Sequence, residues 1–116
     1  MIFAGASTVM AQAVNITVAQ GADAVTLDPA GQNDQPSARV RTQVFETLVK
    51  QNEQLELVPG LAVSWEPIDE LTWEFKLREG VTFHNGDPFT AADVKYSLDR
   101  LADPATGSPS AFIVGF

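Results

Sequence analysis

The sequence has no cysteine and only one histidine, His84. Without cysteine the chain has no disulfide, no thiolate nucleophile and no cysteine metal site. A lone histidine next to the Asn85-Gly86 turn has neither a nucleophile nor an orienting partner to make it a general base. No acidic residues have the spacing of a calcium loop or a zinc site, and no phosphate-binding glycine loop or nucleophile elbow occurs. We therefore expect a chain that is not an enzyme and that has no metal and no cofactor.

Basic residues are also scarce, with 7 Lys and Arg against 15 Asp and Glu, for a formal net charge of -8. An acidic surface repels phosphate backbones and anionic lipid, so nucleic acid and membrane surfaces are disfavoured as partners. The hydrophobic fraction of 45% and the charged fraction of 19% are typical of a globular chain. The length of 116 residues allows at most one small domain.

The N-terminal segment, residues 1–13, is apolar and consists mostly of small residues. It ends in Ala11-Gln12-Ala13, the small-x-small form that signal peptidase cleaves. The first basic residue of the chain is Arg39, so the basic region that opens a signal peptide is missing. We interpret residues 1–13 as the remnant of a secretory signal peptide. The alternative is an apolar tail or a short first helix.

Alternation of polar and apolar side chains predicts several short strands. The clearest runs from Thr72 to Arg78, and we expect three of its side chains to share one face and fill a core: Trp73, Phe75 and Leu77. This strand would pair with residues 61–66 in a hairpin. Shorter strands are predicted at residues 15–19, 55–58 and 81–83, and the first of these has no obvious partner.

Two helices are predicted. The first is capped by Ser37 and runs to about Lys50, with an apolar stripe at helical spacing. The second follows Thr90, with Asp93 as the reciprocal acid of a capping box, and Asp103-Pro104 ends it. We expect its apolar stripe to be buried: Ala91, Val94, Leu98 and Leu101. The pattern as a whole predicts a mixed α/β arrangement with a largely antiparallel sheet.

The order of residues between Pro59 and Arg100 is more specific than this pattern. It includes Pro59-Gly60-Leu61-Ala62-Val63-Ser64-Trp65, Thr72-Trp73-Glu74-Phe75-Lys76-Leu77-Arg78-Glu79-Gly80 and Phe83-His84-Asn85-Gly86-Asp87-Pro88-Phe89-Thr90. Together with segments at residues 26–29 and 45–49, this resembles the family 5 extracellular solute-binding proteins. That family includes the dipeptide-, oligopeptide-, glutathione- and nickel-binding components of ABC importers.

The resemblance implies part of lobe I of a type II periplasmic-binding-protein fold, with a mixed, largely antiparallel sheet and two main helices. It implies the substrate-binding component of an ABC importer for peptides or similar small solutes, which binds ligand between two lobes and delivers it to a membrane permease. Such a protein is periplasmic or otherwise extracytoplasmic, and we expect a monomer. Residues 14–116 would form an incomplete N-terminal portion of the solute-binding domain, in keeping with the apolar run at residues 111–116.

Two stretches could line the ligand cleft in a protein of this kind. Thr26, Leu27 and Asp28 lie in the loop after the first predicted strand. Ser110 and Phe112 lie where peptide-binding members of the family bring an aromatic side chain toward the ligand, with Ser110 in place of that aromatic. An ordinary surface loop is the alternative for each stretch.

Two other functions remain open. A sensor domain of the same fold in a transcriptional regulator would need a helix-turn-helix before residue 14, and the small apolar segment there argues against it. A distantly related hydrolase would need a nucleophile and a base, and the sequence offers no such pair. The identity of the ligand is not indicated by these residues.

Overall fold

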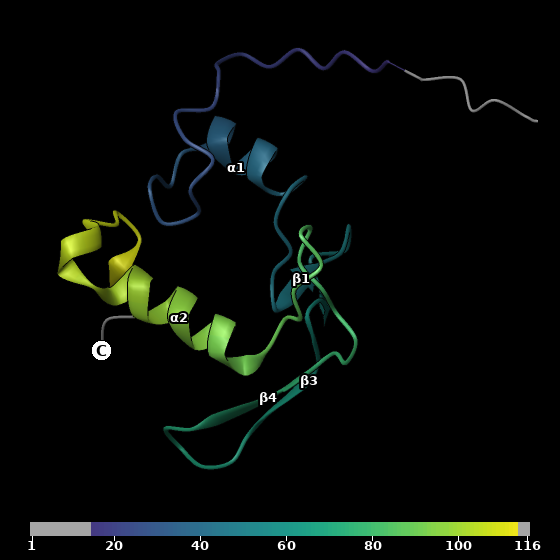
Figure 1. Ribbon diagram of the computed structural model, residues 1–116, viewed down its shortest axis with the longest axis vertical. Coiled ribbons are helices and arrows are strands. Elements are labelled where there is room, and N and C mark those ends of the chain that lie inside the picture. The colour runs from purple at the N-terminus through teal and green to yellow at the C-terminus, as the bar shows by residue number, and fades with distance from the viewer. Residues whose placement is uncertain (1–14, 114–116) are drawn as a thin grey trace, which may run out of the picture.

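The computed structural model describes residues 15–113, so the predicted signal-peptide remnant at residues 1–13 lies outside the described part. Figure 1 shows a short helix near one end of the molecule and a β-hairpin at the other, with a longer helix between them. The elements in chain order are α1 (Gln35–Arg41), β1 (Val49–Gln51), β2 (Leu57–Pro59), β3 (Ala62–Pro67), β4 (Trp73–Leu77), α2 (Ala91–Ala102), and the 3-10 turns η1 (Pro104–Thr106) and η2 (Ala111–Ile113).

The strands form two separate antiparallel pairs. In the first pair, β1 and β2, Val49 lies opposite Pro59. In the second, Pro67 of β3 lies opposite Trp73 of β4, and the register shifts near Ser64. The predicted hairpin of residues 61–66 with 72–78 is therefore confirmed.

The first helix is much shorter than the prediction of Ser37 to about Lys50. Asp34 caps it, accepting a hydrogen bond from the Ser37 N–H at 2.8 Å, and Ser37 itself is buried inside the helix. The helix ends at Arg41, and residues 49–51 pair with β2 as a strand. The intervening residues are rich in β-branched and aromatic side chains, which favour extended backbone, and the pairing with β2 competes with helix extension.

The strand predicted at residues 15–19 is absent, since this segment has no regular secondary structure. A strand is stable only when its N–H and C=O groups have partners, and no described strand pairs with it. The strand predicted at residues 81–83 is reduced to an isolated bridge between Thr82 and Pro88. The turn at Asn85-Gly86 is confirmed, with Gly86 at a φ of 93° that glycine adopts readily.

The second helix begins and ends where the sequence predicts. The Thr90 N–H and hydroxyl donate to Asp93 Oδ2 at 2.7 and 2.8 Å, which completes the capping box. At the other end the Asp103 N–H donates to the Asp99 carbonyl at 2.9 Å, and Pro104 then opens η1. These contacts are local in sequence, and they fix both ends of α2.

Burial differs most from the predictions. Within residues 15–113 the buried apolar residues are Ala30 and Ala62. On β4, Trp73 is 57% and Phe75 is 41% exposed, so the predicted core face is uncovered. On α2, Ala91 and Leu98 are exposed, while Val94 and Leu101 are half-buried. The reason is that no second layer of the described chain packs on either face, and a one-sided element needs such a layer for burial.

The chain is correspondingly extended. Its Cα radius of gyration is 20.0 Å. A compact domain of this length would have a radius of gyration of about 13 Å. No helix in the described range combines the length and the apolarity needed to cross a membrane.

Candidate functional site

The first predicted site stretch forms a tight loop at residues 26–31. The Asp28 N–H donates to Thr26 Oγ1 at 3.1 Å, and the Ala30 N–H donates to Asp28 Oδ1 at 3.0 Å. The Gly31 N–H donates to the Asp28 carbonyl at 3.1 Å. Such side chain to backbone bonds are typical of turns at Asp and Thr. The sequence around Pro29 therefore folds into a loop that is stabilised by its own internal hydrogen bonds.

A bidentate ion pair joins this loop to α2. Arg100 Nη1 donates to Asp28 Oδ1 at 2.8 Å, and Arg100 Nη2 donates to Asp28 Oδ2 at 2.5 Å. The two residues lie 72 positions apart in the sequence. The hydrogen bond from Arg100, with a further one from the Ala30 N–H, lowers the pKa of Asp28 from 3.8 to about 2. The same pairing raises the pKa of Arg100, so both groups stay charged at neutral pH.

A second arginine holds the loop from the side of α1. Arg41 Nη1 donates to the carbonyl of Gln32 at 2.5 Å and to that of Asp28 at 3.2 Å. The buried Ser37 hydroxyl accepts a hydrogen bond from the Val25 N–H at 3.0 Å, just before the loop. The loop is thus held by side chains from both helices.

The contacts define what each predicted loop residue can do. The Asp28 carboxylate is occupied by Arg100 and Ala30, and the Thr26 hydroxyl accepts from the loop itself. Leu27 is 52% exposed and presents an apolar side chain to solvent. The loop can therefore offer a fixed apolar contact, whereas its carboxylate serves the internal structure.

The second predicted stretch lies in and before η2. The Ser110 N–H donates to Ser108 Oγ at 3.2 Å, and the Ile113 N–H donates to the Ser110 carbonyl at 3.0 Å. Phe112 is 70% exposed. The turn η2 contacts α2, and Figure 1 shows it near the end of α2 that carries Arg100. The structure therefore brings both predicted stretches to the same end of α2.

Arg100 and Arg41 are the residues of this region that the sequence analysis missed. They are two of only 7 basic residues in the chain. Both lie in the last turn of their helix. No local pattern marks either arginine, because their contacts with the loop join residues between 9 and 72 positions apart.

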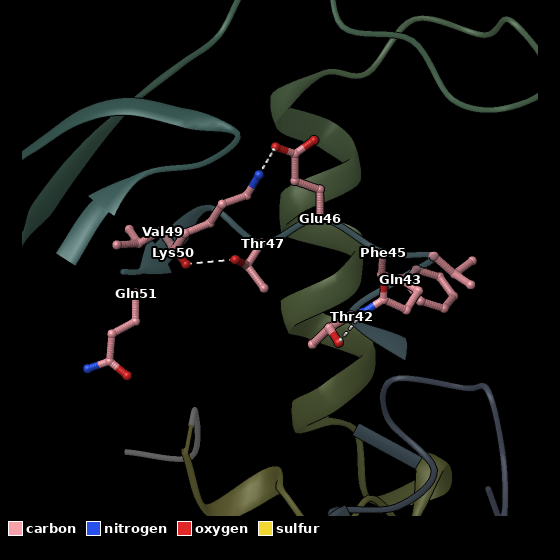
Figure 2. A pocket seen from close by; sticks show the side chains of 9 residues that line it. Thr42, Gln43, Phe45, Glu46, Thr47, Val49, Lys50 and Gln51 are labelled. Carbon is pink, nitrogen blue, oxygen red and sulfur yellow. Dashed lines mark hydrogen bonds and ion pairs between the residues drawn. The ribbon is translucent and has the colours of Figure 1, made fainter. Parts of the chain in front are cut away.

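A separate depression of about 520 Å³ lies between α1 and β1. Figure 2 shows its side chains along one segment, with Phe45 at one end and Gln51 at the other. Lys50 Nζ donates a hydrogen bond to Glu46 Oε1 at 2.6 Å. This bond is the main cause that lowers the pKa of Glu46, and the positive charges of Lys50 and Arg78 lower it further. The lining comes from one segment, residues 42–51 without Leu48, and includes no predicted site residue: Thr42, Gln43, Val44, Phe45, Glu46, Thr47, Val49, Lys50 and Gln51.

Among residues 15–113 no group of three His, Cys, Asp or Glu side chains is placed to hold a metal ion. His84 is exposed beside the Asn85-Gly86 turn. The region around Asp28 and Arg100 is the best-organised candidate site of the described chain. It could bind a ligand through non-covalent contacts with its exposed side chains.

Comparison with known proteins gives consistent matches. Residues 56–115 match the family model described as bacterial extracellular solute-binding proteins, family 5 Middle. The periplasmic murein peptide-binding protein MppA of Escherichia coli is 45% identical over 87 residues, covering 75% of this chain and 16% of MppA. The periplasmic oligopeptide-binding protein OppA of Haemophilus influenzae is 37% identical over 103 residues, covering 88% of this chain and 19% of OppA.

The structural comparison agrees with the sequence matches. The solved structure of the Escherichia coli murein tripeptide-binding protein MppA matches with a TM-score of 0.75 and 43% identity, over 78% of this chain and 18% of that one. The predicted fold, part of a lobe of a periplasmic binding protein, is thereby confirmed. The chain spans less than a fifth of the length of each of these relatives.

Proposed function

The chain belongs to the bacterial extracellular solute-binding proteins of family 5, and we propose that it forms part of the substrate-binding component of an ABC importer. The observation that carries this proposal is the match over residues 56–115, which include the hairpin β3–β4 and helix α2. The family is one of binding proteins outside the cytoplasm. The description of the family as extracellular solute-binding proteins agrees with the expected extracytoplasmic location and supports a binding role in place of catalysis.

Peptides or similar small solutes are the proposed ligands. The support is that relatives matched over most of this chain are named for the binding of murein peptide, oligopeptide and glutathione. A peptide offers apolar side chains as well as a polar backbone, and exposed apolar residues on fixed loops suit the former. Leu27 and Phe112 are such residues: Leu27 precedes Asp28, which pairs with Arg100 of α2, and Phe112 lies in η2, which contacts α2.

The predicted site residues take different roles in this proposal. Leu27 and Phe112 would contact ligand side chains at the edge of the cleft, and Ser110 would offer a small polar group beside Phe112. Thr26 and Asp28 would act by shaping the loop, because their side chains already have partners within the chain. The other wall of the cleft would come from a second lobe.

The remaining parts of the proposal concern organisation and partners. Residues 14–116 would be the N-terminal portion of lobe I, and residues 1–13 the end of a secretory signal. The binding protein would act as a monomer that delivers its ligand to an ABC permease in the membrane. Nucleic acid would have no part in this role, in keeping with the net charge of -8.

A chimera tests the binding role. Residues 15–116 would replace the matching segment of the Escherichia coli murein peptide-binding protein, and peptide binding would be measured by titration calorimetry. We expect a folded chimera with a Kd within about tenfold of that of the unmodified relative, since about 1.4 kcal/mol allows for imperfect junctions. A chimera that folds cooperatively and yet binds no peptide would refute the proposed role. The unmodified relative is the positive control.

A further inference from the structure

The Asp28–Arg100 contact differs from the other ion pairs of the described chain. Lys50–Glu46 and Lys95–Asp99 join residues four positions apart on exposed surface, and the contact of Arg78 with Glu46 is a single one at 3.7 Å. Isolated surface pairs of this kind contribute little to stability. The side chains of Arg100 and Asp28 are also 38% and 36% exposed, but their pair makes two charge-assisted hydrogen bonds and joins residues 72 positions apart. Its geometry therefore fixes the position of one segment relative to the other.

We propose that Arg100 is a positioning residue for ligand binding, which acts through Asp28 to fix the loop at residues 26–31 at the C-terminal end of α2. This inference rests on the proposed binding function and deepens it. The loop lies outside the segment that matches the family model, and Arg100 lies inside it. Arg100 thereby ties the loop at residues 26–31 to α2.

Asp28 is the point at which the contacts of the loop converge. Its carboxylate accepts from both terminal nitrogens of Arg100 and from the Ala30 N–H. Its carbonyl accepts from the Gly31 N–H and from Arg41 Nη1. The side chain and the backbone of Asp28 are therefore both engaged within the chain, next to the exposed Leu27.

The loop has few other means of keeping its place. Ala30 is its one buried residue, while Leu27 and Pro29 are exposed. Without Arg100 it would be held by Arg41 and by the Val25–Ser37 hydrogen bond alone. A loop that is already fixed loses less conformational freedom when a ligand binds, so loss of the pair should weaken binding without removing a ligand contact.

The test uses the chimera defined above with four variants. Arg100→Gln and Asp28→Asn remove the charge pairing, and Arg100→Lys keeps the positive charge but loses the planar two-donor fork. Asp99→Asn is the matched control, since it removes the partner of Lys95 one position away on the same helix. Two quantities are measured for each: the Kd for peptide, and the hydrogen-exchange rates of the Ala30 and Gly31 amides.

We expect Arg100→Gln and Asp28→Asn to raise the Kd and to speed exchange of both amides, each by about three- to fivefold, because solvent weakens a partly exposed ion pair. Arg100→Lys should lie between these variants and the unmutated chimera, and Asp99→Asn should change neither quantity. Should Arg100→Gln fail to fold, Arg100→Lys and Asp28→Asn give the same comparison.

Unchanged exchange in the Arg100 and Asp28 variants would overturn the inference, because the pair would then not fix the loop. Faster exchange with an unchanged Kd would overturn it as well, since the loop would be fixed for stability alone. A chimera that binds no peptide before any substitution would remove the proposed function and the positioning role with it. The exchange rates would still show whether Arg100 orders the loop, so the two failures are distinguishable.

Discussion

At the scale of single residues, contacts between distant positions are what the sequence did not predict. The motif Thr26-Leu27-Asp28-Pro29 indicated a turn, and the turn is present because its hydrogen bonds are local. The partners Arg100 and Arg41 come from two helices that the motif does not mention. Periodicity and turn chemistry report on neighbours along the chain, so they do not identify a contact made across 72 residues.

The pairing of Asp28 has a consequence for pH dependence. Its pKa is lowered from 3.8 to about 2, so the folded state binds its proton less readily than the unfolded state does. The stabilisation is therefore fully present above about pH 4 and is lost as the pH falls toward 2. We expect a carboxyl titration by NMR on the chimera to give a pKa near 2 for Asp28, and a value nearer 3.8 after Arg100→Gln. A pKa near 3.8 in the unmutated protein would contradict the ion pair.

Gly60 gives a prediction about close packing. A Cβ at this position would lie 2.3 Å from the carbonyl oxygen of Thr47 and 2.9 Å from that of Leu48, and both are backbone atoms that cannot rotate away. We expect Gly60→Ala to destabilise the chimera by about 1–3 kcal/mol, the usual cost of overpacking. Urea unfolding would measure it.

The matched control for Gly60 is Gly21→Ala. A Cβ on Gly21 would meet nothing within 4 Å. Its effect should stay within about 0.5 kcal/mol, as for an ordinary surface substitution. Equal effects of the two substitutions would contradict the close approach of Gly60 to Thr47 and Leu48, the two residues before β1.

At the scale of elements, the predictions succeeded where local sequence signals define the ends of a helix. They failed where the pairing of strands determines the secondary structure. The capping box of Thr90 and Asp93 and the stop at Asp103-Pro104 define α2 at both ends. The first helix was predicted too long, because residues 49–51 pair with β2 and because Asp34 takes the capping role assigned to Ser37. The strand predicted at residues 15–19 had a suitable pattern but no partner within the described chain.

The cap of α2 can be tested directly. Thr90→Ala removes the hydroxyl that bonds Asp93, and we expect a loss of about 1 kcal/mol in the unfolding free energy of the chimera. Thr90→Ser keeps the hydroxyl and should cost only a fraction of that. Circular dichroism with urea unfolding would check both. A serine variant as unstable as the alanine variant would show that the methyl group of Thr90, and not the cap, stabilises the helix start.

At the scale of the whole molecule, the sequence encodes faces that the described chain leaves open. The alternation of Trp73, Phe75 and Leu77 predicted the strand correctly and its burial wrongly, because Trp73 and Phe75 are exposed. A periodic pattern shows that a face is suited to burial and does not say which element covers it. In the relatives, which are several times longer, most of the polypeptide lies beyond the matched segment.

The open faces predict how the 116-residue chain behaves alone. Its buried apolar residues within the described range are Ala30 and Ala62, so we expect marginal stability and a broad thermal transition with strong binding of an apolar dye. We also expect no tight peptide binding, because one wall of a cleft cannot enclose a ligand. Calorimetric scanning and titration would check both. A sharp cooperative melt, or submillimolar peptide binding, would contradict this account.

The central claim, that the chain is part of the binding component of a peptide importer, is tested most directly by uptake in living cells. The chimera would be expressed in an Escherichia coli strain that lacks its own murein peptide-binding protein, and import of a labelled murein peptide would be measured. The account predicts that import is restored to a large part of the level given by the unmodified relative. A chimera that is exported and folded, but leaves import at the level of the empty strain, would contradict it.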